Sequence, residues 1–580
     1  MSELIPKDLP KGMDLLREGE EIGAAIEVGV PRFVKERGCS FEDWAMGKYL
    51  EGEVILLPQT GVSTVDGQVE ALREIHAACT KRGIDIGGMI VTSNMLNGLP
   101  KEKREGVPKG TSFVIESPED FDKLMDASPI LPIIGDQMLG TPNSVFNTQN
   151  CLRAGLPYVG VLSQYVWDYP YWHDDVSHVM EVVKALGIVK SKRDVGAIAA
   201  SYVDDGPPAT MLDYASAVGY VLFEQYVCET LCGNRYSTGL GGLMSHIPSK
   251  MAVWMAIHEV LHDLENTEAS VGHIEGNTLD QTEDPNANWG VTMADFIPYA
   301  FLEQKYLTGA AYNPKPVMEA IRVPTIHEVI DVCLSCGMAM KKLPEFKEYG
   351  IIDDTEILKV SKVLAETGRG FFRNLLAGLA DMGVDVKDPL QMLLAVRRLG
   401  GARLEELFHP GQRDPSKYRG INPIATMDVV KIWMPLADRM IEQINAEGLA
   451  NAVQDKTIVM GSTDTHEFAL LMLDRVFSHF DAKVVNLGVD LDAEQVLKAA
   501  ALEKTPHIVI STHNGVSLGW GKRLMDEARQ RKQDVRVCMG GKLNAILEGS
   551  ADPIDVTDQL AEIGIIPCGE PIDAFRNLVK

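Results

Sequence analysis

Short apolar runs alternate with longer amphipathic stretches over most of the first 320 residues. Each apolar run ends in small or polar residues, and each amphipathic stretch is long enough for a helix. This alternation is typical of a parallel sheet whose strands are connected by helices. We expect the strands at 54–58, 86–92, 131–135, 158–162, 195–202, 236–240, 270–274 and 310–317. Eight parallel strands with intervening helices predict a TIM barrel, an α/β fold.

A second series of the same kind starts at Lys456, after a passage rich in Pro and Gly at 409–423. Its apolar runs are 457–460, 483–487, 508–511, 535–539 and 565–567. Five strands with connecting helices predict a flavodoxin-like, Rossmann-like doubly wound domain. The expected organisation is therefore an N-terminal helical segment (1–50), a barrel domain with trailing helices (51–408), a connecting segment (409–455) and a doubly wound domain (456–580).

Composition narrows the classes of partner. The chain has 82 acidic and 55 basic residues, a net charge of -27, so it repels nucleic acids and anionic membranes. No apolar stretch approaches the roughly 18 residues of a membrane span, and the charged, Pro-containing start does not read as a signal peptide. These features predict a cytoplasmic protein that binds neither nucleic acids nor membranes.

One loop of the second series carries residues suited to a metal. Asp464 and His466 follow its first strand, at the carboxyl end of the sheet, where α/β folds bind ligands. Such a histidine can coordinate a metal through one ring nitrogen while the other nitrogen donates to the carboxylate. Later strand ends carry small or hydroxyl residues that leave room for a long, narrow ligand: Ser511, Thr512, Gly515, Gly540 and Gly541.

Together these residues resemble the cobalamin-binding domains of adenosylcobalamin mutases and cobalamin-dependent methionine synthases. The family pattern is Asp-x-His-x-x-Gly, then Ser-x-Leu or Ser-x-Thr, then Gly-Gly. The resemblance implies that His466 is the lower axial ligand of cobalt and that Asp464 orients it. It also implies a nucleotide tail held by Ser511, Thr512, Gly515, Gly540, Gly541 and Gly569. This chain departs from the pattern at Ala469, which replaces the motif glycine, and at His513, which replaces the leucine.

The whole chain resembles glutamate mutase, an adenosylcobalamin-dependent carbon-skeleton mutase, with its barrel and cobalamin subunits fused. The segment from Lys315 to Glu319, with Val323-Pro324-Thr325 behind it, is similar to the eighth-strand segment of that barrel. The resemblance implies that Lys315 and Glu319 contact the ribose of an adenosyl group. Adenosylcobalamin is thus the expected cofactor, and a radical isomerisation after Co–C homolysis the expected reaction. The alternative for this pair is a surface ion pair at the barrel mouth.

The substrate residues of glutamate mutase do not carry over. Where that family grips a dicarboxylate with arginines, this chain has Gln59, Ser93 and Met138, so we expect a substrate other than glutamate. The strand ends form a polar, net acidic set that suits a neutral, hydroxylated or cationic substrate. The candidate catalytic residues are Asp204, Asp205, His273 and Glu275. The candidate substrate-binding residues are Gln59, Asn94, Gln137, Ser163 and Asn277.

Other functions stay open at this point. A corrinoid methyltransferase, which cycles methylcobalamin, would have a similar architecture. His258 to His262 form an HExxH pattern, which can bind zinc, but they fall on an apparent outer helix of the barrel. A cobalamin-dependent sensor would need a signalling module instead of a barrel. We expect a homodimer or association with a further subunit.

Overall fold

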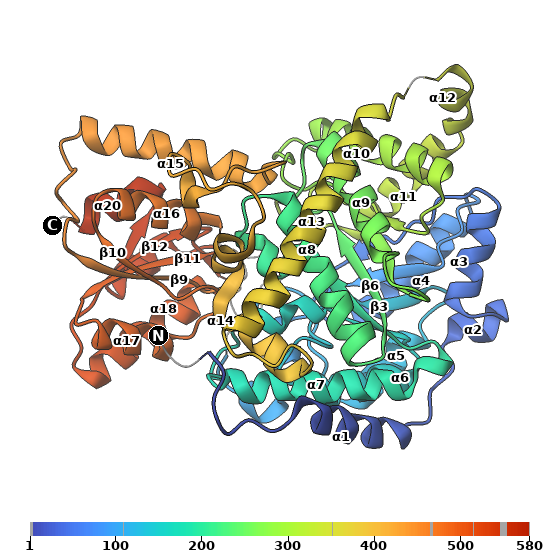
Figure 1. Ribbon diagram of the computed structural model, residues 1–580, viewed down its shortest axis with the longest axis horizontal. Helices are drawn as coiled ribbons and strands as arrows, with labels where there is room; N and C mark the ends of the chain where they lie inside the picture. The colour runs from blue at the N-terminus through green and yellow to red at the C-terminus, as the bar shows by residue number, and fades with distance from the viewer. Residues whose placement is uncertain are drawn as a thin grey trace. The chain divides into compact units, whose positions relative to one another are not determined.

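The computed structural model describes residues 4–107, 109–350, 352–464, 468–513, 515–545 and 554–578. The chain divides into two compact units (Figure 1). Unit 1 consists of Met1–Gly98, Ser112–Val166 and Asp175–Asp428. Unit 2 consists of Leu99–Thr111, Trp167–Asp174 and Val429–Lys580. Two short segments thus belong to unit 2 although unit 1 flanks them in the sequence.

Unit 1 contains eight strands in the order in which the sequence predicts them. They are β1 (Gln59–Thr60), β2 (Gly88–Val91), β3 (Leu131–Ile134), β4 (Tyr158–Val159), β5 (Ile198–Tyr202), β6 (Arg235–Leu240), β7 (Ser270–Glu275) and β8 (Ala311–Asn313). All except β1 overlap the expected runs. The run at 54–58 still belongs to the sheet, because Leu56 forms a parallel bridge with Tyr312.

Parallel ladders join these strands into two arcs, β1-β2-β3 and β4-β5-β6-β7-β8. The arcs meet where Leu57 N donates to Tyr312 O at 2.7 Å and Tyr312 N donates to Ile55 O at 2.8 Å. No ladder joins β3 to β4 in the described part of the chain. Past their ends, Met138 N donates to Gly160 O at 2.9 Å. The predicted parallel α/β architecture is confirmed in this form, as arcs of three and five strands.

A helix follows each of these strands in the sequence. The helices are α4 (Val65–Thr80), α5 (Pro118–Met125), α6 (Ser144–Ala154), α7 (Asp175–Ser191), α8 (Tyr214–Gln225), α9 (Ile247–Leu261), α10 (Pro285–Tyr306) and α11 (Ile326–Met340). The remaining helices of unit 1 are α1 (Gly12–Ala24), α2 (Arg32–Arg37), α3 (Phe41–Leu50), α12 (Leu343–Tyr349), α13 (Thr355–Asp381) and α14 (Pro389–Phe408). Of these, α13 packs on α8 and α9.

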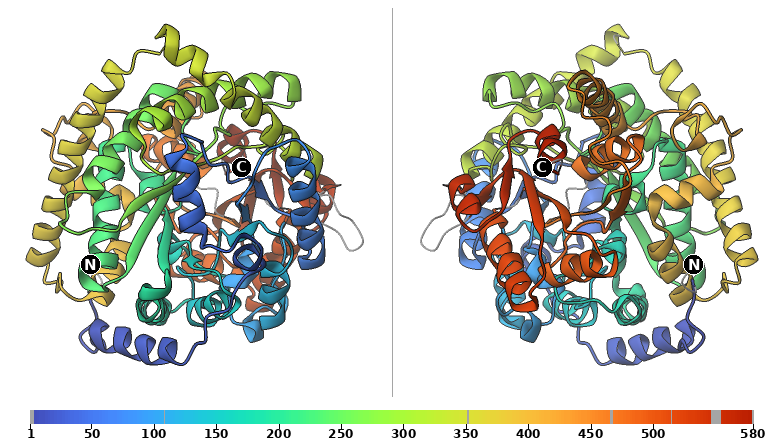
Figure 2. Two further views of the ribbon diagram at one scale, coloured as in Figure 1. Left: turned by 90° about the vertical axis from the view of Figure 1, so that its right-hand side faces the viewer. Right: turned by 90° about the vertical axis from the view of Figure 1, so that its left-hand side faces the viewer.

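Helix α1 lies lengthwise against α7 (Figures 1 and 2). Two glycines allow this close approach. A Cβ atom on Gly19 would come within 1.9 Å of the Lys184 carbonyl oxygen, and one on Gly187 within 2.1 Å of the Leu16 carbonyl oxygen. Any larger residue at either position would push the two helices apart.

Unit 2 is built on one five-stranded parallel sheet of order β10-β9-β11-β12-β15. Its strands are β9 (Thr457–Ser462), β10 (Lys483–Asn486), β11 (His507–Thr512), β12 (Arg536–Gly541) and β15 (Ile566–Cys568). Numbered along the chain, the order is 2-1-3-4-5, which is the flavodoxin-like order. The prediction of a doubly wound domain is therefore confirmed.

Helices cover both faces of this sheet. Figure 1 shows α16 (Phe468–His479) and α20 (Pro571–Leu578) on one face, and α17 (Ala493–Leu502) and α18 (Ser517–Arg531) on the other. The second face holds a continuous apolar core in which Val459, Ile508 and Val537 contact these helices. Helix α15 (Asp428–Ala446) leads into the sheet, a short hairpin pairs β13 (Asn544–Ala545) with β14 (Ile554–Asp555), and α19 (Thr557–Glu562) precedes β15.

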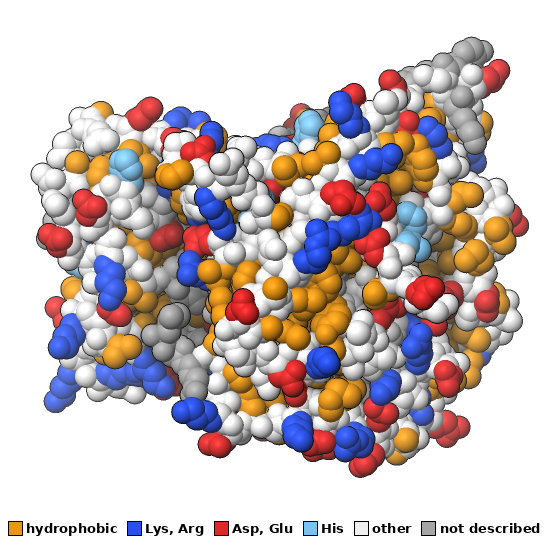
Figure 3. Space-filling view, viewed as in Figure 1, with side chains coloured by type: hydrophobic (Ala, Val, Ile, Leu, Met, Phe, Trp, Pro, Cys, Tyr) orange, Lys and Arg blue, Asp and Glu red, His pale blue; other side chains and the backbone are white. Residues whose placement is uncertain are grey.

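No described helix is long and apolar enough to cross a membrane. On the face drawn in Figure 3, basic side chains lie among acidic ones instead of forming a continuous stripe.

Candidate functional site

The predicted cobalamin residues lie at one edge of the unit 2 sheet. Ser511 pairs in register with Ser462 on β9 and with Gly540 on β12, and Thr512 pairs with Gly541. Gly569 follows directly after β15. The carboxyl ends of the central strands therefore bring these side chains and glycines to one level, as the sequence predicts.

Asp464 directs its carboxylate toward the end of the neighbouring strand. Its Oδ2 accepts a hydrogen bond of 2.5 Å from His513 N, and its Oδ1 lies 4.0 Å from His513 Nδ1. His466 lies outside the described residues, as does Asn514. The structure therefore describes the carboxylate that would orient the ligand histidine, and a second histidine beside it.

The hydroxyl groups at this edge of the sheet differ in whether they have a hydrogen-bond partner. The Thr512 hydroxyl accepts a 2.8 Å hydrogen bond from Thr463, whereas the buried Ser511 Oγ has no partner in the described part of the chain. A Cβ atom on Gly569 would meet nothing closer than 3.9 Å. An orphaned buried hydroxyl costs stability unless a ligand satisfies it. These residues fit a polar group inserted along the sheet edge.

Two glycines here serve the backbone. Gly541 has a φ of 102°, and a Cβ atom on it would come within 2.3 Å of the Thr512 carbonyl oxygen. Gly515 has a φ of 73° at the start of the turn into α18. Both positions require glycine for conformational reasons, whatever the ligand.

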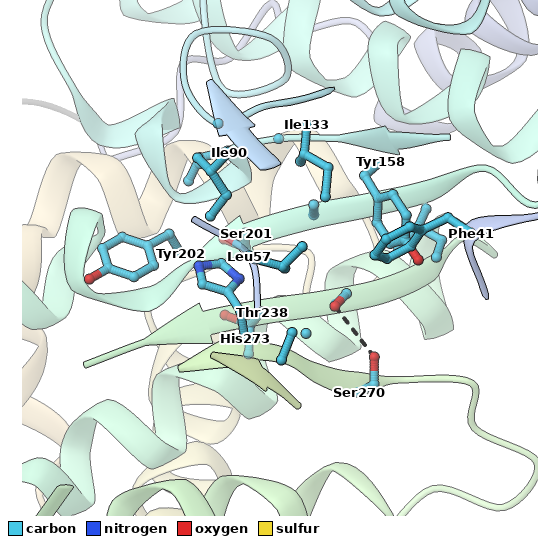
Figure 4. Close-up of a pocket in the computed structure, with 18 of the residues that line it drawn as sticks. Phe41, Leu57, Ile90, Ile133, Tyr158, Ser201, Tyr202, Thr238, Ser270 and His273 are labelled. Atoms are coloured by element: carbon cyan, nitrogen blue, oxygen red, sulfur yellow. Dashed lines mark hydrogen bonds between the residues drawn. The ribbon is translucent and has the colours of Figure 1, made fainter. Parts of the chain in front are cut away.

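Unit 1 encloses a cavity of about 490 Å³ between its strands. Tyr202 and His273 lie at its carboxyl end, and Phe41 and Tyr158 lie at the opposite end (Figure 4). Leu57, Ile90 and Ile133 form an apolar wall between the two ends of the cavity. The volume falls within the range of about 300–1,000 Å³ that is usual for small-molecule sites.

Glu275 is the centre of a polar network at the carboxyl end of the cavity. Its Oε2 accepts from the Tyr202 hydroxyl at 3.0 Å and lies 2.9 Å from Lys315 Nζ, and its Oε1 accepts from Asn313 at 3.1 Å. Lys315 Nζ also donates to Gln59 Oε1. His273 stacks on Tyr202 and lies 3.6 Å from Glu275. Although burial alone would raise it, Lys315 and His273 hold the pKa of Glu275 below its usual value.

Asp136 and Asp205 form a second network through Gln164. The Gln164 side-chain amide donates to Asp136 Oδ1 at 3.1 Å and to Asp205 Oδ2 at 3.2 Å. Its oxygen accepts from Gln137 N at 2.9 Å, which fixes the direction of the amide. Burial and the nearby Glu275 raise the pKa of Asp136 to about 6. Burial and the nearby Asp136 raise the pKa of Asp205 well above its usual value.

The structure brings together only part of the predicted unit 1 site. Gln59, Asp205, His273 and Glu275 line the cavity. Five other predicted residues are buried outside its lining: Asn94, Gln137, Ser163, Asp204 and Asn277. Ser163, for example, donates its hydroxyl to Glu224 at 2.7 Å. Asp204 accepts from Tyr202 at 3.1 Å and acts on the site through that tyrosine.

Lys315 and Glu319 lie close to this site without pairing with each other. Lys315 is committed to Glu275 and Gln59, whereas the Glu319 carboxylate makes no side-chain hydrogen bond or ion pair in the described chain. Burial raises the pKa of Glu319, and Lys315 partly offsets the effect. The alternative of a Lys315–Glu319 ion pair is therefore wrong.

Gln164, Tyr202 and Asn313 are site residues that the sequence reasoning missed. Gln164 follows the predicted strand at 158–162 and Tyr202 ends the one at 195–202, so the rule that α/β ligands bind at carboxyl ends could have found these two. Asn313 lies inside the predicted strand at 310–317 and ends the observed β8. The HExxH pattern lies on α9 and in the turn after it, where Glu259 pairs with Arg369 at 3.0 Å. Within the described ranges, no group of three or more His, Cys, Asp or Glu side chains could hold a metal.

Comparisons with known proteins bear on unit 2. Residues 458–556 match the family model of the B12 binding domain. Glutamate mutase sigma subunits of Escherichia coli O157:H7 and Shigella dysenteriae serotype 1 (strain Sd197) are 32% identical over 114 residues, which cover 19% of this chain and 72% of each relative. A crystal structure of a cobalamin-binding protein from Desulfitobacterium hafniense DCB-2 matches 26% of this chain and 80% of its own, with 10% identity and a TM-score of 0.19. Through this segment, the chain belongs to the B12-binding family that includes the sigma subunit of glutamate mutase.

Proposed function

We propose that this chain is an adenosylcobalamin-dependent radical isomerase that rearranges a small polar metabolite other than glutamate. The observation that carries the proposal is the presence, in one polypeptide, of a B12-binding segment and an enclosed cavity with titratable groups at its strand ends. In this proposal, residues 51–408 form a complete (β/α)8 barrel with trailing helices. A connecting segment at 409–455 leads to the cobalamin-binding domain at 456–580. Homodimers, or a further subunit, would complete the enzyme.

In unit 2, His466 would be the cobalt ligand and Asp464 would orient its ring. The nucleotide tail would enter beside Ser511, Gly540 and Gly569, where the buried Ser511 hydroxyl has no partner among the described residues and a Cβ atom on Gly569 would meet nothing closer than 3.9 Å. Thr512, Gly515 and Gly541 would shape the backbone around it. When bound, adenosylcobalamin supplies a cobalt–carbon bond that can break homolytically and so start hydrogen abstraction.

In unit 1, Glu319 is the group best placed to distinguish adenosylcobalamin from methylcobalamin. A vicinal diol is well matched by one carboxylate that accepts two hydrogen bonds, and the Glu319 carboxylate has no competing partner in the described chain. Lys315, held by Glu275, would keep the local charge balanced. Gln59, Asp205, His273 and Glu275 would face the substrate, and Asn94, Gln137, Ser163, Asp204 and Asn277 would support the strand ends that carry them.

The test is an anaerobic EPR experiment on the protein loaded with adenosylcobalamin, with metabolites added one at a time. A cobalt(II) signal coupled to an organic radical would identify the reaction class and the substrate together. A corrinoid methyltransferase would show no such signal, and it would instead lose the methyl group of bound methylcobalamin to an acceptor. That second result would replace the isomerase with a methyltransferase.

A further inference from the structure

The charges around the unit 1 cavity are distributed unevenly. At the amino-terminal end of the strands, Arg235 pairs with both Glu42 and Glu268. At the carboxyl end, Lys315 pairs with Glu275. Asp136, which lines the same end, has no Lys, Arg or His side chain of the described residues within ion-pair distance. Lys315, which pairs with Glu275, acts on Asp136 only at longer range, so the Asp136 carboxylate has no ion-pair partner of its own among the described residues.

The groups around Asp136 indicate which kind of ligand could balance the charge of its carboxylate. Gln164 provides one amide hydrogen bond at 3.1 Å, and the Asp205 carboxyl group bonded to the same amide adds a second acceptor. The same cavity is lined by the apolar side chains of Ile90, Ile133 and Leu57, which lie between Tyr202 and Phe41 (Figure 4). A ligand that complements this arrangement carries hydrogen-bond donors and positive charge at one end and carbon along its length.

We infer that the cavity binds a primary alkylammonium group against Asp136, with Asp205 as the second acceptor and the alkyl body against the apolar wall. The substrate class is therefore an amine with no carboxylate near its ammonium group. The inference rests on the proposed function only in placing the reaction in this cavity. An anionic head group would meet Asp136, Asp205 and Glu275 at the same end and would be repelled.

The protonation of the carboxyl pair supports this assignment. Burial and the nearby Glu275 raise the pKa of Asp136 to about 6, and burial and the nearby Asp136 raise the pKa of Asp205 well above its usual value. A bound ammonium ion would favour the ionised form of both carboxyl groups, so its binding should be accompanied by proton release. The groups that face the pair are Gln164, Glu275, Lys315 and Asp204.

Isothermal titration of the full-length protein without cobalamin tests the inference, with n-pentylammonium, 1-pentanol and pentanoate as probes of equal length. We expect n-pentylammonium to bind with a dissociation constant on the order of 1 mM, which is ordinary for six non-hydrogen atoms. The alcohol and the carboxylate should bind at least about 10-fold more weakly. Titration in two buffers of different ionisation enthalpy should show proton release.

Asp136→Asn should weaken n-pentylammonium binding on the order of 10 to 100-fold, because it removes a charge-assisted contact. The matched control is Asp126→Asn, since the Asp126 side chain is 70% exposed and pairs only with Lys35 among the described cations. Pentanoate binding as tight as that of the amine, or unchanged amine binding in Asp136→Asn, would overturn the inference. If Asp136→Asn does not fold, the three-probe series on the unmodified protein still decides.

The experiments distinguish a failure of the proposed radical isomerase from a failure of the ammonium site. Amine binding without cobalt(II) formation would keep the ammonium site and remove the radical isomerase. Cobalt(II) formation with a carboxylate substrate and no amine binding would do the reverse.

Discussion

The ammonium group of Lys315 lies 2.9 Å from the carboxylate of Glu275, and both side chains are largely withdrawn from solvent, with exposures of 6% and 14%. Burial alone would raise the pKa of Glu275, but Lys315 and His273 lower it below its usual 4.5. The stabilisation from this pair is therefore complete above about pH 4.5 and is lost as the pH falls through the depressed pKa.

Lys315→Met should lower the free energy of unfolding by about 3 kcal/mol at pH 7.5, because it leaves a buried carboxylate without its cation. The loss should be smaller at pH 5, because the pKa of Glu275 is higher in the variant and its carboxylate takes up a proton at this pH. Urea unfolding at both pH values measures this. Lys305→Met is the control, because its pair with Asp354 is more exposed and should contribute below about 1 kcal/mol. Equal losses at both pH values would mean that Lys315 acts through packing alone.

His466→Ala should remove the imidazole nitrogen contribution from the EPR spectrum of bound cobalt(II) cobalamin. Asp464→Asn should weaken binding about 10 to 100-fold, as changes to groups that orient metal ligands usually do. His479→Ala, on α16 in the same unit, should leave the spectrum unchanged. Retained nitrogen hyperfine structure in His466→Ala would refute the axial assignment.

Ser511→Ala should separate folding from cofactor binding. The Ser511 Oγ is buried without a partner in the described chain, so its removal should leave the melting temperature of the cobalamin-free protein unchanged or slightly higher. Cobalamin affinity should fall about 2 to 10-fold, the worth of one neutral hydrogen bond. Fluorescence titration and thermal melts measure the two quantities. A lower melting temperature with unchanged affinity would assign Ser511 to the fold.

Glu319→Ala should weaken adenosylcobalamin binding on the order of 10 to 100-fold, because a hydrogen bond to a charged group contributes about 1.5–3 kcal/mol. Glu319→Gln should show a smaller loss. Methylcobalamin and hydroxocobalamin lack the adenosyl ribose and should bind both variants nearly as they bind the unmodified protein. Equal losses for all three cofactors would mean that Glu319 supports the fold or the corrin.

Glutamate should neither turn over nor trigger cobalt(II) formation. Gln59 hydrogen-bonds Thr92 and Asn313, and neither Ser93 nor Met138 supplies a cation where a dicarboxylate would need one. Production of 3-methylaspartate at roughly 1 per second, an ordinary turnover for an enzyme on its own substrate, would contradict this. The product can be followed by chromatography.

The strand pattern was predictable because buried parallel strands leave continuous apolar runs in the sequence. The same pattern predicts the flavodoxin-like domain of unit 2, in which Ser511 and Gly540 end neighbouring strands at one level. The level of a residue along a strand can thus be inferred from its distance to the end of an apolar run.

The direction of a side chain beyond the strand end could not be inferred in this way. Ser163 and Gln164 are neighbours in a 3-10 turn at Leu162–Val166. The hydroxyl of Ser163 goes to Glu224 on α8, whereas the amide of Gln164 goes to Asp136 and Asp205. The prediction included Ser163 and missed Gln164, because adjacent side chains in a turn point in different directions. The amino-acid sequence of the turn does not specify which of them points toward the site.

Unit 2 is assembled from three separate pieces of chain, and this limits how the protein can be cut. Tyr171 N donates to Asp492 Oδ2 at 2.6 Å, and the Tyr171 hydroxyl accepts from Arg523. Proteolysis at 409–423 would leave Leu99–Thr111 and Trp167–Asp174 on the amino-terminal fragment. The carboxyl-terminal fragment would then present Asp492 and Arg523 without their tyrosine. A carboxyl-terminal fragment released at this passage would therefore contain only one of the three pieces that make up unit 2.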